Sequence, residues 1–197
     1  MASMSHELRT PLNTVLGMSE ALVEGAYGPT TDNQRASLAL IHESGSHLLS
    51  LINDILDVSK IEAGELKLDL APCSITDLCE SSVRMIRPAS GKKRLQFTFE
   101  DESAPASAVV DYRRLKQALV NLLSNPVKFT PEGGEFGLSV SKRREGEDEF
   151  FTMQVWDKGI GIPEGEIENL FVPFQQIESE LTSQQSGTGL GLVIAKR

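Results

Sequence analysis

The amino-acid sequence predicts an α + α/β fold, in which a helical hairpin is followed by a two-layer α/β sandwich. Two observations carry this prediction. Up to residue 63 the apolar residues recur at intervals of three and four, which is typical of helices packed in a bundle. Beyond Gly64, short apolar stretches with the two-residue period of a strand alternate with helical patterns. We therefore expect two domains, residues 1–64 and residues 65–197.

Two long helices are expected in the first domain. The first apolar stripe, which a turn at residues 25–29 should end, consists of Leu8, Leu12, Val15, Ser19, Leu22 and Ala26. The second stripe, which follows Asp32 as a plausible N-cap and should end at Gly64, runs through Leu38, Ile41, Gly45, Leu48, Ile52 and Ile55. Two helices cannot bury two such wide faces against each other, so we expect a homodimer in which two hairpins form a four-helix bundle. The alternative is that the hairpin packs on the rest of its own chain.

A mixture of strands and helices is expected in the second domain. Leu66, Leu68 and Leu70 alternate with the period of a strand, and a helix should begin at Ser74. The further expected elements are a strand at 95–99, a helix at 111–129, and a hairpin of strands 136–142 and 150–156 joined by a polar turn at 143–149.

Composition excludes several classes of partner. The formal net charge of -9 and the pI of about 4.9 argue against nucleic acid or an anionic membrane surface as the main partner. No apolar run approaches the roughly 18 residues that span a bilayer, and no secretory signal opens the chain. Cys73 and Cys79 fit neither a zinc site nor a disulfide framework, so we expect reduced cysteines and a cytoplasmic location.

The octapeptide SHELRTPL at residues 5–12 contains the candidate reactive residues of the first helix. His6 and Thr10 share one face of a helix, Glu7 sits about 100° round, and Pro11 should bend the helix just past the histidine. An imidazole with a carboxylate beside it can move a phosphoryl group. The alternative is an exposed histidine that merely neighbours a glutamate.

A polar face is expected on the otherwise apolar helix at 111–129. Asn121, Asn125 and Lys128 can share this face. Amide oxygens suit a hydrated Mg²⁺ ion and a lysine ammonium suits a phosphate, so the face could hold a metal nucleotide. A polar surface without a ligand is the alternative.

Two glycine-rich segments lie further along the chain. Asp157, Gly159 and Gly161 directly follow the last predicted strand and allow a tight turn with the backbone close to a ligand, although a turn alone would explain them. The segment GTGLGL at 187–192 opens a final helix, where free N–H groups favour phosphate. Such a glycine pattern is weak evidence by itself, and its context is not that of a Rossmann fingerprint.

Taken together, these segments resemble the motifs of sensor histidine kinases, in family order from His6 to Leu192. SHELRTPL is similar to the phosphoacceptor box and NLLSNPVKFT to the asparagine box. DKGIGI, LFVPF and GTGLGL resemble the first glycine box, the phenylalanine box and the second glycine box of the Bergerat-type ATP-binding fold. The resemblance implies a kinase core that uses ATP and Mg²⁺, dimerises, and passes phosphate to a response regulator receiver domain.

The resemblance also implies a role for each matched residue. His6 would accept the phosphoryl group, Glu7 would act as base toward the ring, and Thr10 would place a water that hydrolyses the phosphorylated regulator. In the ATP-binding part Asn125 would ligate Mg²⁺, with Asn121 as a nearby polar partner, and Lys128 would contact a phosphate. Asp157 would accept from the adenine amino group, and Gly159 and Gly161 would shape the base pocket. The hinges of the lid over the triphosphate would be Gly187, Gly189 and Gly191. Phe174 and Thr188 are the remaining cofactor-binding candidates, from the phenylalanine box and the second glycine box.

The sequence departs from the family pattern in three ways. Pro126 stands where the family usually has alanine, which should bias Asn125 away from helical geometry and weaken nucleotide binding. Lys158 replaces a small polar residue. The chain starts close to His6 and stops before the family's final strands, so we expect a piece of a longer kinase, with any membrane attachment upstream of it.

Two other function classes follow from these departures and motifs. A degenerate phosphotransfer or docking module would keep His6 without binding ATP. An ATPase of the wider Bergerat superfamily, such as a chaperone or topoisomerase, would use ATP for clamp closure, but the histidine box on a bundle hairpin argues against it.

Overall fold

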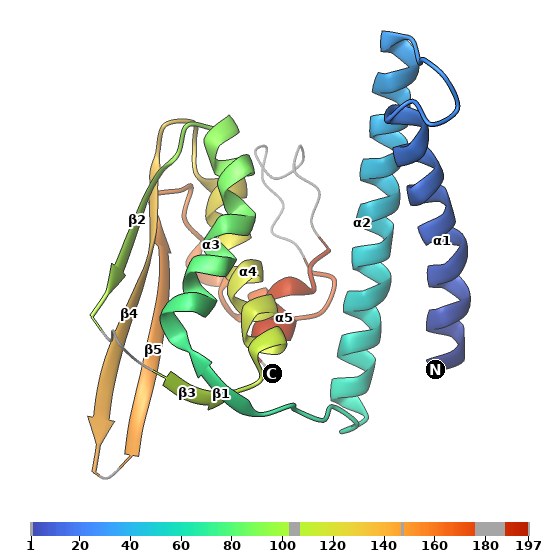
Figure 1. The fold of residues 1–197 in the computed structure, drawn as a ribbon. Coiled ribbons are helices and arrows are strands. Elements are labelled where there is room, and N and C mark those ends of the chain that lie inside the picture. The colour runs from blue at the N-terminus through green and yellow to red at the C-terminus, as the bar shows by residue number, and fades with distance from the viewer. Residues whose placement is uncertain (1, 103–106, 147, 176–187, 197) are drawn as a thin grey trace. The chain divides into compact units, whose positions relative to one another are not determined.

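The structure is a computed structural model that describes residues 2–102, 107–146, 148–175 and 188–196 (Figure 1). The chain divides into two compact units, residues 1–66 and residues 67–197. The first is a helical hairpin and the second combines helices with a mixed sheet, so the predicted fold class is confirmed. None of the described helices is both long enough and apolar enough to cross a membrane.

The first unit consists of α1 (Ala2–Val23) and α2 (Asp32–Glu62). A capping box starts α2, because the Thr31 hydroxyl accepts from the Gln34 amide while Oε1 of Gln34 accepts from the Thr31 amide at 2.8 Å. The expected N-cap was therefore wrong by one residue, and Asp32 is instead an acidic residue in the first turn. As predicted, Gly64 follows the end of the helix, with a φ of 68°.

The loop after α1 corrects a second expectation. Ala26 was assigned to the apolar stripe of the helix, but α1 ends at Val23. Gly25 adopts a φ of 80°, and the Ala26 amide folds back to donate to the carbonyl of Ala21 at 2.9 Å. This pair of features is a glycine-terminated helix end, which reverses the chain before Ala26 can extend the stripe.

The two helices approach closely at Gly45. A Cβ atom added there would lie 2.9 Å from a methyl carbon of Leu16, so the absence of a side chain lets the helices pack. Next to this crossing the buried Ser19 hydroxyl donates to the Leu16 carbonyl and lies 3.4 Å from Nδ1 of His42. The centre of the hairpin is therefore tight and partly polar.

The apolar stripe of α2 separates into two series with a seven-residue spacing. One series is at least partly buried and consists of Leu38, Gly45 and Ile52. The other is exposed and consists of Ile41, Leu48 and Ile55, at 47%, 49% and 42% of their full surface. On α1, Leu8 and Val15 are likewise exposed at 47% each. A hairpin by itself thus leaves a second apolar seam in water, in the pattern of a helix bundle.

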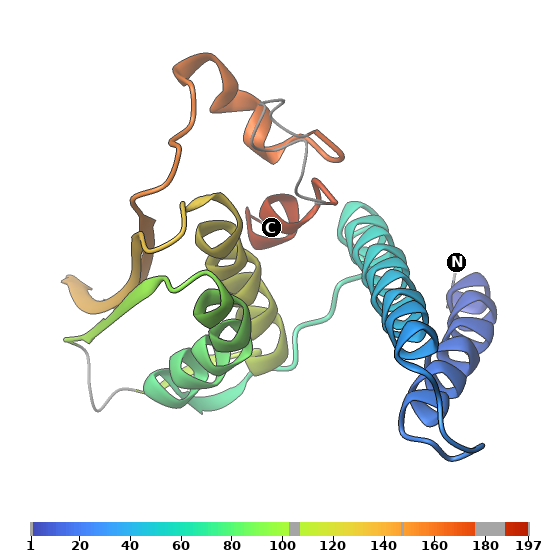
Figure 2. The same cartoon turned by 90° about the horizontal axis from the view of Figure 1, so that it is seen from above.

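The second unit places its two long helices on one face of a three-stranded sheet (Figure 1). Its elements are β1 (Ala71–Ser74), α3 (Ile75–Lys92), β2 (Gln96–Asp101), β3 (Ser107–Val110), α4 (Tyr112–Phe129), β4 (Glu135–Glu145), β5 (Asp148–Asp157), the short 3-10 helices η1 (Glu164–Glu166) and η2 (Glu168–Phe171), and α5 (Gly191–Lys196). Strand β4 lies in the centre, parallel to β2 and antiparallel to β5. Figure 2 shows α3 and α4 side by side.

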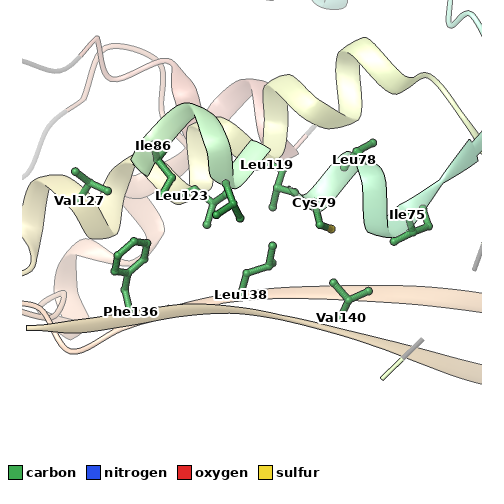
Figure 3. Packing of buried hydrophobic residues seen from close by; sticks show 11 residues of the cluster. Ile75, Leu78, Cys79, Ile86, Leu119, Leu123, Val127, Phe136, Leu138 and Val140 are labelled. Atoms are coloured by element: carbon green, nitrogen blue, oxygen red, sulfur yellow. The ribbon is translucent and has the colours of Figure 1, made fainter. Parts of the chain in front are cut away.

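The core of this unit lies between the two helices and β4 (Figure 3). Phe136, Leu138 and Val140 alternate along β4 and are fully buried, and they point toward the helices. The helices contribute their apolar faces, which include Leu78, Cys79, Ile86, Leu119 and Leu123. Burial raises the pKa of the Cys79 thiol to about 12, and this cysteine is a small apolar core residue.

Two strand predictions need correction. Leu66, Leu68 and Leu70 are not in a strand, and β1 begins only at Ala71, which pairs with Val110 of β3. The residue after Val110, Asp111, turns the chain into α4, so residues before Ala71 have no strand to pair with. The second correction concerns the polar turn, because β4 and β5 stay paired as far as Glu145 and Asp148, so most residues expected in the turn belong to the strands.

Candidate functional site

The phosphoacceptor motif lies on α1. His6 is within the helix, and the side chains of Glu7 and Thr10 are exposed. One turn beyond the histidine, Nη2 of Arg9 donates to Oδ1 of Asn53 on α2 at 2.9 Å. This hydrogen bond ties the motif to the second helix of the hairpin. Pro11 lies inside α1, and the bend expected there remains a prediction.

The asparagine motif lies on α4, whose start is fixed by Asp111. The Asp111 carboxylate accepts from the Arg114 amide at 3.0 Å and from the Asp69 amide at 3.0 Å. These backbone hydrogen bonds, that from Asp69 first, lower the pKa of the Asp111 carboxyl. The cap thus also fixes the segment that leads into β1.

Pro126 does not break α4, which contradicts the expected distortion at Asn125. The helix continues to Phe129, Asn125 stays helical, and the carbonyl of Pro126 accepts from the Thr130 amide at 2.9 Å. The proline ring is fully buried. Burial of this apolar ring against the core offsets the hydrogen bond that the missing N–H cannot make to Leu122.

Of the three residues of the predicted polar face, Asn125 and Lys128 have no side-chain partner among the described residues. Both are half-buried, and within the described part of the chain neither side chain has a hydrogen bond or an ion pair. Burial lowers the pKa of the Lys128 ammonium from its ordinary value. Asn121 is different, because its Nδ2 donates to the carbonyl of Gly191 at 3.3 Å and so tethers the start of α5.

The first glycine turn packs directly on the end of α4. The Ile160 amide donates to the carbonyl of Phe129 at 3.4 Å, and Oδ1 of Asp157 accepts from the Gly159 amide at 2.8 Å. A Cβ atom on Gly159 would lie 2.5 Å from that Asp157 oxygen and 2.8 Å from the Phe129 carbonyl oxygen. Only glycine fits this contact. Gly161 adds a φ of 72°, which favours glycine for conformational reasons.

The phenylalanine motif and the second glycine motif meet at their backbones. The Phe174 amide donates to the Gly189 carbonyl at 3.2 Å, and a Cβ atom on Gly189 would lie 2.8 Å from the Phe174 carbonyl carbon. Phe174 has a φ of 64° and a largely exposed ring. The Thr188 hydroxyl accepts from the Leu190 amide just before α5 begins at Gly191. Gly187 lies outside the described residues.

The structure therefore brings the candidate residues together in three pairs of segments within the second unit. The end of α4 meets the turn at 157–161, Asn121 meets the start of α5, and Phe174 meets Gly189. His6, Glu7 and Thr10 belong to the other unit. Sequence reasoning missed Lys93, which contacts the end of α4, and the buried Thr130 hydroxyl, which has no hydrogen-bond partner among the described residues.

A magnesium nucleotide fits the residues at the end of α4. The amide of Asn125 and the ammonium of Lys128 have no partner among the described residues, and the turn at Gly159 packs its backbone on the end of the same helix. No group of three or more His, Cys, Asp or Glu residues among the described residues could hold a metal ion. One amide oxygen is nevertheless sufficient for Mg²⁺, which usually keeps several waters and takes phosphate oxygens as further ligands.

Two family models match the chain. Residues 1–64 match the His Kinase A (phospho-acceptor) domain, and residues 110–197 match the histidine kinase-, DNA gyrase B- and HSP90-like ATPases. The circadian input-output histidine kinase CikA of Synechococcus elongatus is 45% identical, over 100% of this chain and 26% of its own length. The cell-division control histidine kinase PdhS of Brucella suis is 38% identical, over 100% of this chain and 20% of its own length.

Solved structures agree with these matches. Full-length ShkA in complex with AMPPNP superposes with a TM-score of 0.75 at 33% identity, covering 99% of this chain and 39% of that one. The catalytic domain of the histidine kinase ThkA gives a TM-score of 0.54 at 27% identity, covering 66% of this chain and 78% of that one. The chain thus belongs to the histidine kinases, as a phospho-acceptor domain followed by an ATPase-type domain. It spans about a quarter of the length of curated relatives such as CikA.

The contact at Gly159 generates a prediction about stability. We expect Gly159→Ala to lower the free energy of unfolding by about 1–3 kcal/mol, because the new methyl group must push the turn off α4. Gly165→Ala is the matched control, since a Cβ there meets nothing within 4 Å. Urea unfolding of both variants measures the difference, and equal stability would show that the turn moves without cost.

Proposed function

We propose that the chain is a catalytic kinase core that transfers the γ-phosphoryl group of ATP to an imidazole nitrogen of His6, and then to an aspartate of a response regulator receiver domain. One observation carries the proposal. In the last turns of α4 a half-buried lysine and an asparagine have no partners among the described residues, and the carbonyl that ends the same helix contacts a turn in which position 159 has no room for a side chain.

Different residues of the ATP-binding unit contact the base and the phosphates of the nucleotide. Asp157, at the end of β5, accepts from the adenine amino group, and Gly159 and Gly161 shape the base pocket. Lys128 contacts the phosphates, where its ammonium offsets their charge, and Asn125 ligates Mg²⁺. Bound Mg²⁺ would supply further neutralisation of the phosphate oxygens. Gly187, Gly189 and Gly191 hinge the segment that closes over the triphosphate.

The residues of α1 carry the phosphoryl transfer. Glu7 orients the imidazole of His6 and accepts its proton as the bond to phosphorus forms. Thr10, one turn further, places a water that hydrolyses the phosphorylated regulator. The hydrogen bond between Arg9 and Asn53 supports this assignment, because it holds the segment beside His6 against α2.

One further feature supports a catalytic core over a degenerate docking module, and another supports the homodimer. The module was an alternative because Pro126 should distort the asparagine motif, but α4 is regular there and Asn125 is helical. The exposed series Ile41, Leu48 and Ile55 supports a homodimer, since it leaves an apolar seam for a second hairpin.

Labelled ATP tests the phosphoacceptor. We expect the wild-type chain to acquire an acid-labile, base-stable label, and His6→Ala to acquire none. His47→Ala is the matched control, because His47 is exposed on α2 and has no neighbouring motif. Label that persists in His6→Ala would mean that another residue accepts the phosphoryl group.

Lys128→Met should raise the stability of the fold and weaken the binding of ATP. The lowered pKa means that folding disfavours the charged ammonium, so its removal should raise the free energy of unfolding. This gain is full below the folded-state pKa and shrinks as pH rises toward the ordinary lysine value, because the folded wild type then loses its proton. ATP binding should weaken about tenfold or more.

Calorimetry with Mg-ATP and urea unfolding at several pH values measure both effects of this variant. Lys67→Met is the control, because Lys67 is exposed. A variant that loses stability along with affinity would contradict the assignment of Lys128 to the ligand.

Leu48→Glu tests the dimer. The charge falls in the exposed seven-residue series of α2, so the variant should have the mass of a monomer by light scattering at micromolar concentration. Ser50→Glu is the control, because Ser50 is exposed away from that series. A monomeric wild type would refute the four-helix bundle.

A further inference from the structure

Lys93 places its ammonium on the last carbonyl groups of α4. Its Nζ donates to the carbonyl oxygen of Lys128 at 2.6 Å and to that of Thr130 at 3.4 Å. The side chain is half-buried, whereas the neighbouring Lys92 is exposed. Within the described part of the chain, Lys93 forms no ion pair with a carboxylate. Its charge is therefore committed to the end of the helix.

These carbonyl groups need a donor from elsewhere in the fold. The last carbonyl groups of a helix have no partner within it, and a cation stabilises the negative end of the helix dipole. Pro131 follows directly, so the chain cannot continue the helix to supply the missing amides. Lys93 provides charged hydrogen bonds at this position, which are stronger than neutral ones.

The carbonyl between the two that Lys93 binds belongs to Phe129. It accepts from the Ile160 amide of the glycine turn at 3.4 Å. The same oxygen leaves no room for a side chain at position 159, because a Cβ atom there would lie 2.8 Å from it. Lys93 on one side and the turn on the other thus hold three consecutive carbonyl groups. If Lys93 no longer binds the carbonyl groups of Lys128 and Thr130, the carbonyl of Phe129 can rotate away from the Ile160 amide.

We propose that Lys93 is a positioning residue, which fixes the end of α4 so that the glycine turn at 157–161 is held in the geometry that binds adenine. The proposal deepens the proposed function and rests on it for the identity of the ligand. It does not make Lys93 a contact of the nucleotide, because both of its hydrogen bonds go to backbone carbonyl groups.

The first test needs no nucleotide. Amide hydrogen exchange in the free protein should show faster exchange at Ile160 and Thr130 in Lys93→Met, by about tenfold or more, and unchanged exchange in β4 and β5. Lys92→Met should leave all these amides unchanged, and Lys93→Arg should restore slow exchange, because a guanidinium can donate to both carbonyl groups. Equal acceleration in the sheet would mean that Lys93 only stabilises the whole unit, which would overturn the proposal.

The second test measures binding of adenosine, ADP and Mg-ATP by calorimetry. Lys93→Met should weaken all three by the same factor, about tenfold, and Lys93→Arg should recover most of it. A loss confined to ADP and ATP would place Lys93 on the phosphates and overturn the positioning role. A wild-type chain that binds none of the three would refute the proposed function, while the exchange experiment would still decide whether Lys93 fixes the turn.

Discussion

The packing of α4 on β4 is the constraint on which the candidate site depends. Leu119, Leu123 and Val127 commit one face of the helix to the core, opposite Phe136 and Leu138 of the central strand. A helix fixed in this way cannot rotate, so the face that carries Asn125 and Lys128 is held away from the core. The position of the polar groups is thus set by apolar contacts that take no part in the chemistry.

The same helix shows how the fold accepts locally unfavourable features at the site. Pro126 removes a backbone donor in the last turns of α4, and Lys128 keeps a half-buried ammonium without a partner among the described residues. Each feature costs folding free energy by itself. Burial of the proline ring and the two hydrogen bonds of Lys93 offset part of that cost, and a bound anion could pair with the Lys128 ammonium.

The sequence predicts those features that depend on periodic burial. The long helices, the β4–β5 hairpin and the polar face of α4 were predicted because each buries one face in a regular pattern. Strand β3 has only four residues, and its sequence does not alternate apolar with polar residues although its burial alternates, so only its pairing with β1 defines it. Leu66, Leu68 and Leu70 have the sequence pattern of a strand but no neighbouring strand. Propensity rules also misjudged Asn125, because tertiary packing overrides the local effect of Pro126.

Contacts between segments that are distant in the sequence explain the features of the site that the motifs did not predict. Lys93 lies in a short run of basic residues with no periodic or motif signal. Its ammonium nevertheless donates to the carbonyl of Lys128, which lies 35 residues further along the chain. Gly159 belongs to a motif, but the reason that glycine is required is the carbonyl of Phe129, which no local pattern indicates. A motif in this protein therefore marks where a candidate segment of the site lies. The backbone contacts of that segment come from elsewhere in the fold, because the turn packs on the end of α4 and Lys93 donates to the same helix end.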